Sequence, residues 1–152
     1  MLGTAPSRIA AMAEGLTPVQ LRTKPDPENW SAVEVLAHLR CCADVWGDAI
    51  RRIRDEDHPT IKAVDPRTWA RDTNYTELEF HPSLDAYTSQ RANLLTLLEA
   101  LSPNDLSRAA TLRGAGKPIE RTLRGFAQRI AIHERPHIKQ IDRALKVIRE
   151  KP

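Results

Sequence analysis

Apolar residues recur at intervals of three and four along four stretches of the chain, a spacing typical of amphipathic α-helices. Stretches in which every second residue is apolar are absent, so no β-strand is predicted. The expected helices run over about Pro6–Glu14, Ser31–Ile53, Ser83–Leu101 and Thr122–Arg149. Four such helices without strands predict an all-α fold, a four-helix bundle, in a single domain over residues 1–152.

Local signals fix where the second helix begins and where the chain is irregular. Ser31 followed three residues later by Glu34 is a capping box, in which each side chain bonds the backbone N–H of the other residue. Proline residues and the lack of periodicity predict a long loop over Asp55–His81, with one short turn around Trp69. A loop of that length is often functional, and here it is a candidate lid or dimer contact. The glycines of Arg113–Pro118 predict a second, flexible loop.

Composition excludes several classes of protein. The 152 residues are 41% hydrophobic and 28% charged, which is ordinary for a globular domain, and the net charge of +3 is spread along the chain. No basic run is interleaved with aromatic residues, so we expect no nucleic-acid partner. No apolar stretch approaches the ~20 residues of a membrane span, and no signal peptide is recognised. Cys41 and Cys42 are adjacent on a helix and cannot easily form a disulfide, so a cytoplasmic location is expected.

Three histidines occupy positions where the helical pattern calls for apolar residues. His133 and His137 are four residues apart, which stacks their rings on one face of the last helix, and His38 lies on the apolar side of the second. Neutral imidazole binds divalent ions such as zinc and nickel. Three histidine ligands leave one position for water or substrate, whereas a structural zinc site is closed by four protein ligands. The sequence therefore predicts a catalytic metal site at His38, His133 and His137.

Other interpretations of these residues remain open. The three histidines could be core residues that hydrogen-bond to one another or to the backbone. Cys42 lies on the same side as His38, one turn further on, and a soft metal could recruit its thiolate, although a buried helical cysteine is usually a small apolar filler. His58 and His81 fall in or beside the long loop and are expected to be surface residues.

Three further residues bear on the histidine pair of the last helix. Glu134 and Gln140 flank it and could orient the imidazoles; Glu134 could also act as a catalytic base, or simply belong to a solvated helix face. Pro136 lies between His133 and His137, removes a backbone donor and clashes with the carbonyl of Ile132. Because the apolar periodicity continues in register on both sides, a kink is expected rather than a break.

Three segments in order carry a resemblance to a known family. They are Trp30–Leu39, which contains Glu34-Val35-Leu36-Ala37-His38; Leu95–Leu106; and Ile132–Ile141, which contains His133-Glu134 and His137. Together they resemble the DinB-like superfamily, including its YfiT-type and mycothiol- or bacillithiol-dependent branches. The resemblance implies up-down-down-up topology, a homodimer, and a divalent metal, zinc or nickel, on His38, His133 and His137. Pro136 departs from the family pattern, in which a helix-compatible residue is usual.

The resemblance implies several activities for such a site. The first is transfer of a low-molecular-weight thiol as co-substrate to a small electrophile; the nearest alternative is metal-dependent hydrolysis of a small molecule. Arg51, Arg52 and Arg129 are candidates to hold an anionic group of the substrate. The rival from another class is a non-catalytic homodimeric bundle whose metal is structural or absent.

Overall fold

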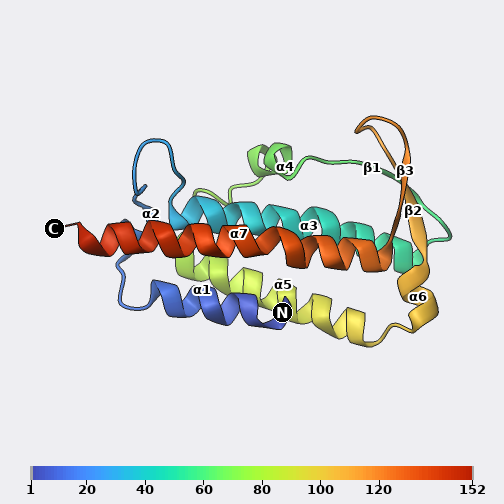
Figure 1. The fold of residues 1–152 in the computed structure, drawn as a ribbon, viewed down its shortest axis with the longest axis horizontal. Helices are drawn as coiled ribbons and strands as arrows, with labels where there is room; N and C mark the ends of the chain where they lie inside the picture. The colour runs from blue at the N-terminus through green and yellow to red at the C-terminus, as the bar shows by residue number, and fades with distance from the viewer. Residues whose placement is uncertain (1, 152) are drawn as a thin grey trace.

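Four long helices form the body of the computed structural model, which describes residues 2–151. They are α1 (Ala5–Ala13), α3 (Ala32–Asp55), α5 (Phe80–Glu99) and α7 (Leu123–Glu150). Figure 1 shows that α3 and α5 run in one direction along the bundle and that α1 and α7 run in the other. The predicted four-helix bundle with up-down-down-up topology is therefore confirmed.

The ends of the helices follow the capping signals of the sequence. Ser31 and Glu34 form the expected capping box at the start of α3: the Ser31 hydroxyl accepts from the backbone N–H of Glu34, and the Glu34 carboxylate accepts from that of Ser31. The same reciprocal arrangement begins two short helices, α2 (Pro18–Arg22) and α6 (Pro103–Ser107), and a 3₁₀ turn, η1 (Leu2–Thr4), precedes α1. Local side-chain chemistry thus sets where α2, α3 and α6 begin.

A small sheet at one end of the bundle corrects the prediction that strands are absent. It consists of β1 (Thr60–Lys62), β2 (Ala109–Arg113) and β3 (Ile119–Thr122), in the order β1-β2-β3. β1 pairs parallel to β2, with Ile61 opposite Leu112. β3 pairs antiparallel to β2. Strands of three to five residues are too short for a period-two pattern to emerge from the sequence. The loop predicted around Gly114 and Gly116, both at positive φ, is the turn between β2 and β3.

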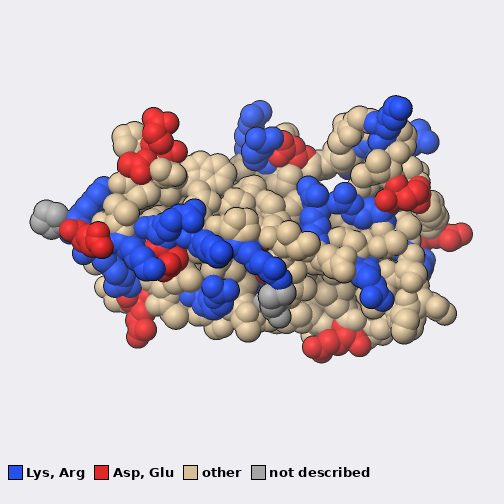
Figure 2. All heavy atoms as spheres, in the orientation of Figure 1, with Lys and Arg blue, Asp and Glu red and all other residues tan. Residues whose placement is uncertain are grey.

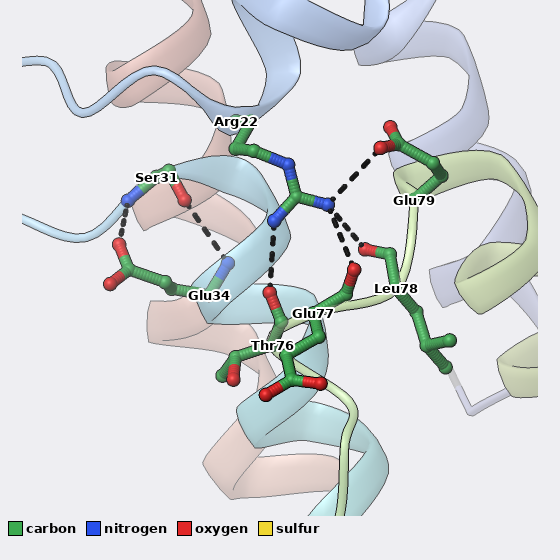
Figure 3. A network of polar contacts seen from close by, with 7 residues as sticks. All are labelled: Arg22, Ser31, Glu34, Thr76, Glu77, Leu78 and Glu79. Atoms are coloured by element: carbon green, nitrogen blue, oxygen red, sulfur yellow. Dashed lines mark hydrogen bonds and ion pairs between the residues drawn. The ribbon is translucent and has the colours of Figure 1, made fainter.

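The segment predicted as one long loop, Asp55–His81, contains more regular structure than expected. Besides β1 it carries α4 (Pro66–Asp72), capped by Asp65, which confirms a helical turn around Trp69. The chain between α4 and α5 is fastened by Arg22 at the end of α2 (Figure 3). Its guanidinium donates to the carbonyls of Thr76, Glu77 and Leu78 and to the Glu79 carboxylate at 3.0–3.3 Å. This long connection therefore has a fixed course over the bundle.

The apolar interior is divided into two clusters along the bundle. One is built on α1, α2, α5 and the first part of α3, and it takes Ile138, Ile141 and Leu145 from α7. The other joins the second part of α3 to β1 and β2, and takes Leu123, Phe126 and Ile130 from α7. The two turns of α7 between the clusters, residues 131–137, carry Glu134 as their buried residue. Buried polar residues in the middle of a helix are costly and are expected where a site is built.

Helix α7 is continuous through Pro136. Pro136 is exposed, and Ile132, whose carbonyl loses its donor, has 65% of its surface exposed. The missing hydrogen bond therefore lies on the solvent side, where water can satisfy the carbonyl. As predicted, the helix does not break between His133 and His137. Neither α7 nor any other helix within residues 2–151 is long and apolar enough to cross a membrane.

Candidate metal centre

The three histidines predicted as ligands meet between α3 and α7. The centroid of the His38 ring lies 5.2 Å from that of His133 and 4.7 Å from that of His137. The rings of His133 and His137 are 4.6 Å apart, so the presence of Pro136 does not separate them. All three side chains are half-buried, at the margin of the apolar stripes rather than at their centre. The fold thus brings His38 to a histidine pair that follows it by 95 positions or more in the chain.

The spacing of the donor atoms can be compared with a tetrahedral site. With metal–nitrogen bonds of about 2.0–2.1 Å and a metal–sulfur bond of about 2.3 Å, tetrahedral ligand atoms lie about 3.3 Å (N···N) and about 3.6 Å (N···S) apart. The Nε2 atoms of His133 and His137 are 3.3 Å apart, and Cys42 Sγ lies 3.6 Å from His38 Nε2. Ligand atoms of His38, Cys42 and His133 all lie within 4.8 Å of one another. These spacings suit a divalent ion; His137 is outside this group of three and adjoins it at His133, through the 3.3 Å contact between the two Nε2 atoms.

Two of the imidazoles, those of His38 and His133, have lowered pKa values. The pKa of His38 is lowered to about 4, mainly by burial and further by the neighbouring His137. The pKa of His133 is also lowered to about 4, by burial first and then by His137 and His38. Both rings are therefore neutral at pH 7, and a metal ion would not have to displace a proton from them.

Gln140 orients the third ring. Its side-chain oxygen lies 2.9 Å from His137 Nδ1, and we assign Nδ1 as the donor because an amide oxygen can only accept. That tautomer leaves a lone pair on His137 Nε2, the atom that faces His133. A partner on the outer nitrogen is a regular feature of histidine ligands. The contact also fits hydrogen-bonded core histidines, the alternative raised by the sequence.

Cys42 is a buried thiol beside the histidines. Burial, followed by the neighbouring Cys41, raises its pKa to about 12, so without a metal the group is protonated at neutral pH. Cys41 and Cys42 are both free and buried, in agreement with the expectation that they do not form a disulfide.

Glu134 lies elsewhere than expected. It is 4% exposed, so its placement on a solvated face was wrong. Its carboxylate oxygens accept from both terminal nitrogens of Arg91 at 2.5 and 2.8 Å and from the Tyr87 hydroxyl at 2.6 Å. Arg91 also donates to the carbonyl of Leu2, which ties the start of the chain to α5. Both Glu134 oxygens accept hydrogen bonds, which argues against the role of catalytic base that the sequence raised as one alternative for this residue.

Aromatic side chains and two hollows surround the cluster. The Trp30 ring lies 5.5 Å from His38, and the Trp46 ring meets His133 edge-on at 4.9 Å. A hollow of about 250 Å³ is bordered by His137, Gln140 and the segment Glu28–Trp30. Trp46 also lines a larger cavity of about 1040 Å³, which has none of the three histidines in its wall. The smaller hollow therefore borders the cluster directly at His137, and the larger cavity adjoins it through Trp46, whose ring contacts His133.

The other residues considered in the sequence lie away from the cluster. His58 is exposed and contacts Thr111 and Glu120, and His81 is exposed, as expected. Arg52 pairs with Glu56 at 2.8 Å and lines neither of the two hollows. Trp30, which directly precedes the N-cap of α3, was not predicted to lie beside the histidines, although its ring is 5.5 Å from that of His38.

Known proteins share both the sequence pattern and the fold. A protein of Geobacillus kaustophilus named "putative metal-dependent hydrolase" is 30% identical over 139 residues, which is 90% of this chain and 75% of that protein. One of Geobacillus thermodenitrificans with the same name is 30% identical over 113 residues, 72% of this chain and 62% of its own length. The structure of YfiT from Bacillus subtilis, described as a probable metal-dependent hydrolase with an unusual four-helix bundle topology, superposes with a TM-score of 0.76. It is 22% identical, and the match covers 95% of this chain and 82% of YfiT.

A family model supports the same relationship over most of the chain. The model of the DinB superfamily matches residues 1–141, which include all three histidines of the cluster. The two Geobacillus proteins are similar to the chain in sequence, and YfiT is similar to it in fold. The chain belongs to the DinB superfamily.

Proposed function

We propose that the protein is a metal-dependent hydrolase in which His38, His133 and His137 hold a divalent ion. The observation that carries the proposal is the convergence of the three imidazoles, with the Nε2 atoms of His133 and His137 at the spacing of tetrahedral ligands. The names of the two Geobacillus relatives support hydrolysis as the reaction.

The residues around the cluster have distinct parts in this function. A divalent ion held there would supply an activated water molecule and polarise the bond that is cleaved. Gln140 holds the His137 ring in the orientation that presents Nε2. Burial keeps His38 and His133 neutral, and the Trp46 ring packs edge-on against His133. The hollow that His137 borders leaves room for a small molecule beside this ligand.

Thiol transfer, the activity that the sequence resemblance placed first, uses the same three ligands. The names of the curated relatives favour hydrolysis instead, so thiol transfer takes second place here. A requirement for an added thiol separates the two reactions. The homodimer stays a prediction.

One contact favours a different function, a structural metal site. Cys42 Sγ is 3.6 Å from His38 Nε2, the separation of two ligands on one tetrahedral ion. If the thiolate binds, four protein ligands close the site and leave no position for water. The protein would then be a helical binding module stabilised by its metal.

Metal content of the purified untagged protein is the first test. We expect about one divalent ion per chain in the wild type, and loss of that ion in His137→Ala with the fold retained. His81→Ala is the matched control, because His81 is an exposed histidine outside the cluster. Unchanged metal content in His137→Ala would refute the ligand assignment.

Cobalt substitution then distinguishes the catalytic site from the structural one. A thiolate ligand gives Co²⁺ an intense ligand-to-metal charge-transfer band, which would disappear in Cys42→Ser. We expect no such band. We also expect the protein to hydrolyse some members of a panel of small esters and amides, without any added thiol, and a chelator to abolish this activity. A strong band in the wild type, with no chelator-sensitive hydrolysis, would favour the structural role.

A further inference from the structure

The larger cavity has a basic wall that nothing in the metal site requires. It lies between α3, the segment from β1 to α4, the β2–β3 hairpin and the start of α7, and it measures about 1040 Å³. Six of its lining residues are basic (Arg51, Lys62, Arg67, Lys117, Arg121, Arg129) and three are acidic (Asp44, Asp48, Asp65). Figure 2 shows Lys and Arg side chains gathered below the hollow between α4 and the hairpin. We propose that Arg121 and Arg129 bind a carboxylate or phosphate group of the substrate in this cavity.

The acidic residues of the wall do not neutralise these two arginines. Asp65 is paired with Arg67 at 2.8 Å. Asp44 accepts from the side chains of Trp69, Tyr75 and Gln90 at 2.5–3.1 Å. The charge of Asp48 contributes to the raised pKa of Arg52 on the same helix, after the hydrogen bond between Arg52 and Glu56. Among residues 2–151, no carboxylate forms an ion pair with Arg121 or Arg129.

The two arginines are also close enough to repel each other. The pKa of Arg121 is lowered, first by burial and then by the charge of Arg129. Two guanidinium groups without a carboxylate between them gain attraction from both sides when an anion binds between them. The planar guanidinium can donate two parallel hydrogen bonds to a carboxylate or phosphate, which suits it to such ligands.

Aromatic rings hold both guanidinium groups at the cavity wall. That of Arg129 lies 4.8 Å from the centroid of the Trp46 ring, and that of Arg121 lies 5.6 Å from the centroid of Phe126. Trp46 and Phe126 both line the cavity, together with the apolar Ile61. The ligand that fits this surface therefore combines an anionic group with an apolar or aromatic body.

The basic wall is adjacent to the candidate centre. Arg129 precedes His133 by one helical turn, so their side chains lie on the same face of α7. Trp46 is shared: its ring lies under Arg129 and meets His133 edge-on at 4.9 Å. If the proposed hydrolase function holds, on which this step rests, the substrate is a small ester or amide with an anionic group about one helical turn from the bond that is cleaved.

Binding to the metal-free protein tests the anion site without relying on the reaction. Benzoate and phenyl phosphate serve as anionic probes, and benzamide is the neutral counterpart of benzoate. We expect an anion to shift the Nε–Hε resonances of Arg121 and Arg129 in NMR titrations and to bind about tenfold or more tightly than benzamide. Binding should weaken with added salt. Comparison of the two anions shows whether the site prefers carboxylate or phosphate.

Two variants complete the test. Arg121→Gln/Arg129→Gln should lower the anion affinity by about tenfold or more. The control Arg124→Gln, at an exposed position of α7 outside the cavity, should keep the wild-type affinity. His137→Ala should bind the anions as the wild type does, which separates this site from the metal site. Equal binding of benzoate and benzamide, no binding of either anion, or full binding by the double variant would overturn the proposal.

Discussion

The buried ion pair between Arg91 and Glu134 makes a quantitative prediction about stability. Their side chains are 2% and 6% exposed, so neither charge is screened by solvent. Replacing Arg91 by Met keeps an apolar chain of similar length but leaves the Glu134 carboxylate with the Tyr87 hydroxyl alone. Loss of one partner of a buried pair costs about 3–5 kcal/mol, because a charge remains buried without compensation. For a chain of this size, about 2–4 °C per kcal/mol gives a fall in Tm of about 6–20 °C.

Urea denaturation of the metal-free protein measures this loss. The control Arg124→Met, in an exposed position of α7, should change the free energy of unfolding by less than about 0.5 kcal/mol. Arg91→Met/Glu134→Gln removes both charges and retains an acceptor for Tyr87, so it should recover more than half of the loss. A cost below about 1 kcal/mol for Arg91→Met, or no recovery in the double variant, would refute this account of the network.

Three other predictions concern the site and the helices. Because the pKa values of His38 and His133 fall from 6.5 to about 4 on folding, the unfolded state takes up protons first as the pH falls. The metal-free protein should therefore be most stable above pH 6.5 and lose stability towards pH 4; urea titrations in which His38→Ala/His133→Ala shows the same pH dependence would contradict this. Pro136→Ala restores a donor to the Ile132 carbonyl and should raise the free energy of unfolding by about 1–3 kcal/mol with metal content unchanged; a less stable variant would mean that the proline shapes the site. Ser31→Ala removes the cap of α3 and should cost about 0.5–2 kcal/mol, whereas the exposed Ser7→Ala, measured in the same way, should cost less.

The sequence predicted those parts of the structure that depend on neighbouring residues. The capping box at Ser31 and the apolar spacing of α3 and α7 are local signals, and the helices begin and end within a few residues of the expected positions. The sheet was missed because its stability comes from pairing between Thr60–Lys62 and Thr111–Arg113, about fifty residues apart, and three residues carry no periodicity. Non-local pairing of such short segments leaves no pattern in one sequence.

The candidate site was predictable in its residues and less so in its surroundings. The spacing of His133 and His137 indicated one face of a helix, and the structure brings His38 to that face. The sequence also contains a signal for the Arg91–Glu134 pair, because both charged residues occupy apolar positions of their helices. Arg91 interrupts the apolar stripe of α5, and Glu134 lies four residues from both Ile130 and Ile138, each of which is buried. Two opposite charges at apolar positions of two helices are the signature of a buried ion pair.

The up-down-down-up topology has a consequence for how the chain folds. Helix α1 packs against α7, so the first helix finds its partner more than one hundred residues later. The cluster that contains α1 takes Ile138, Ile141 and Leu145 from α7, and the other takes Leu123, Phe126 and Ile130. During synthesis neither apolar cluster can close before α7 emerges from the ribosome. Such non-local contacts slow folding relative to bundles whose successive helices pair in order, so α7 is the element whose docking completes the protein.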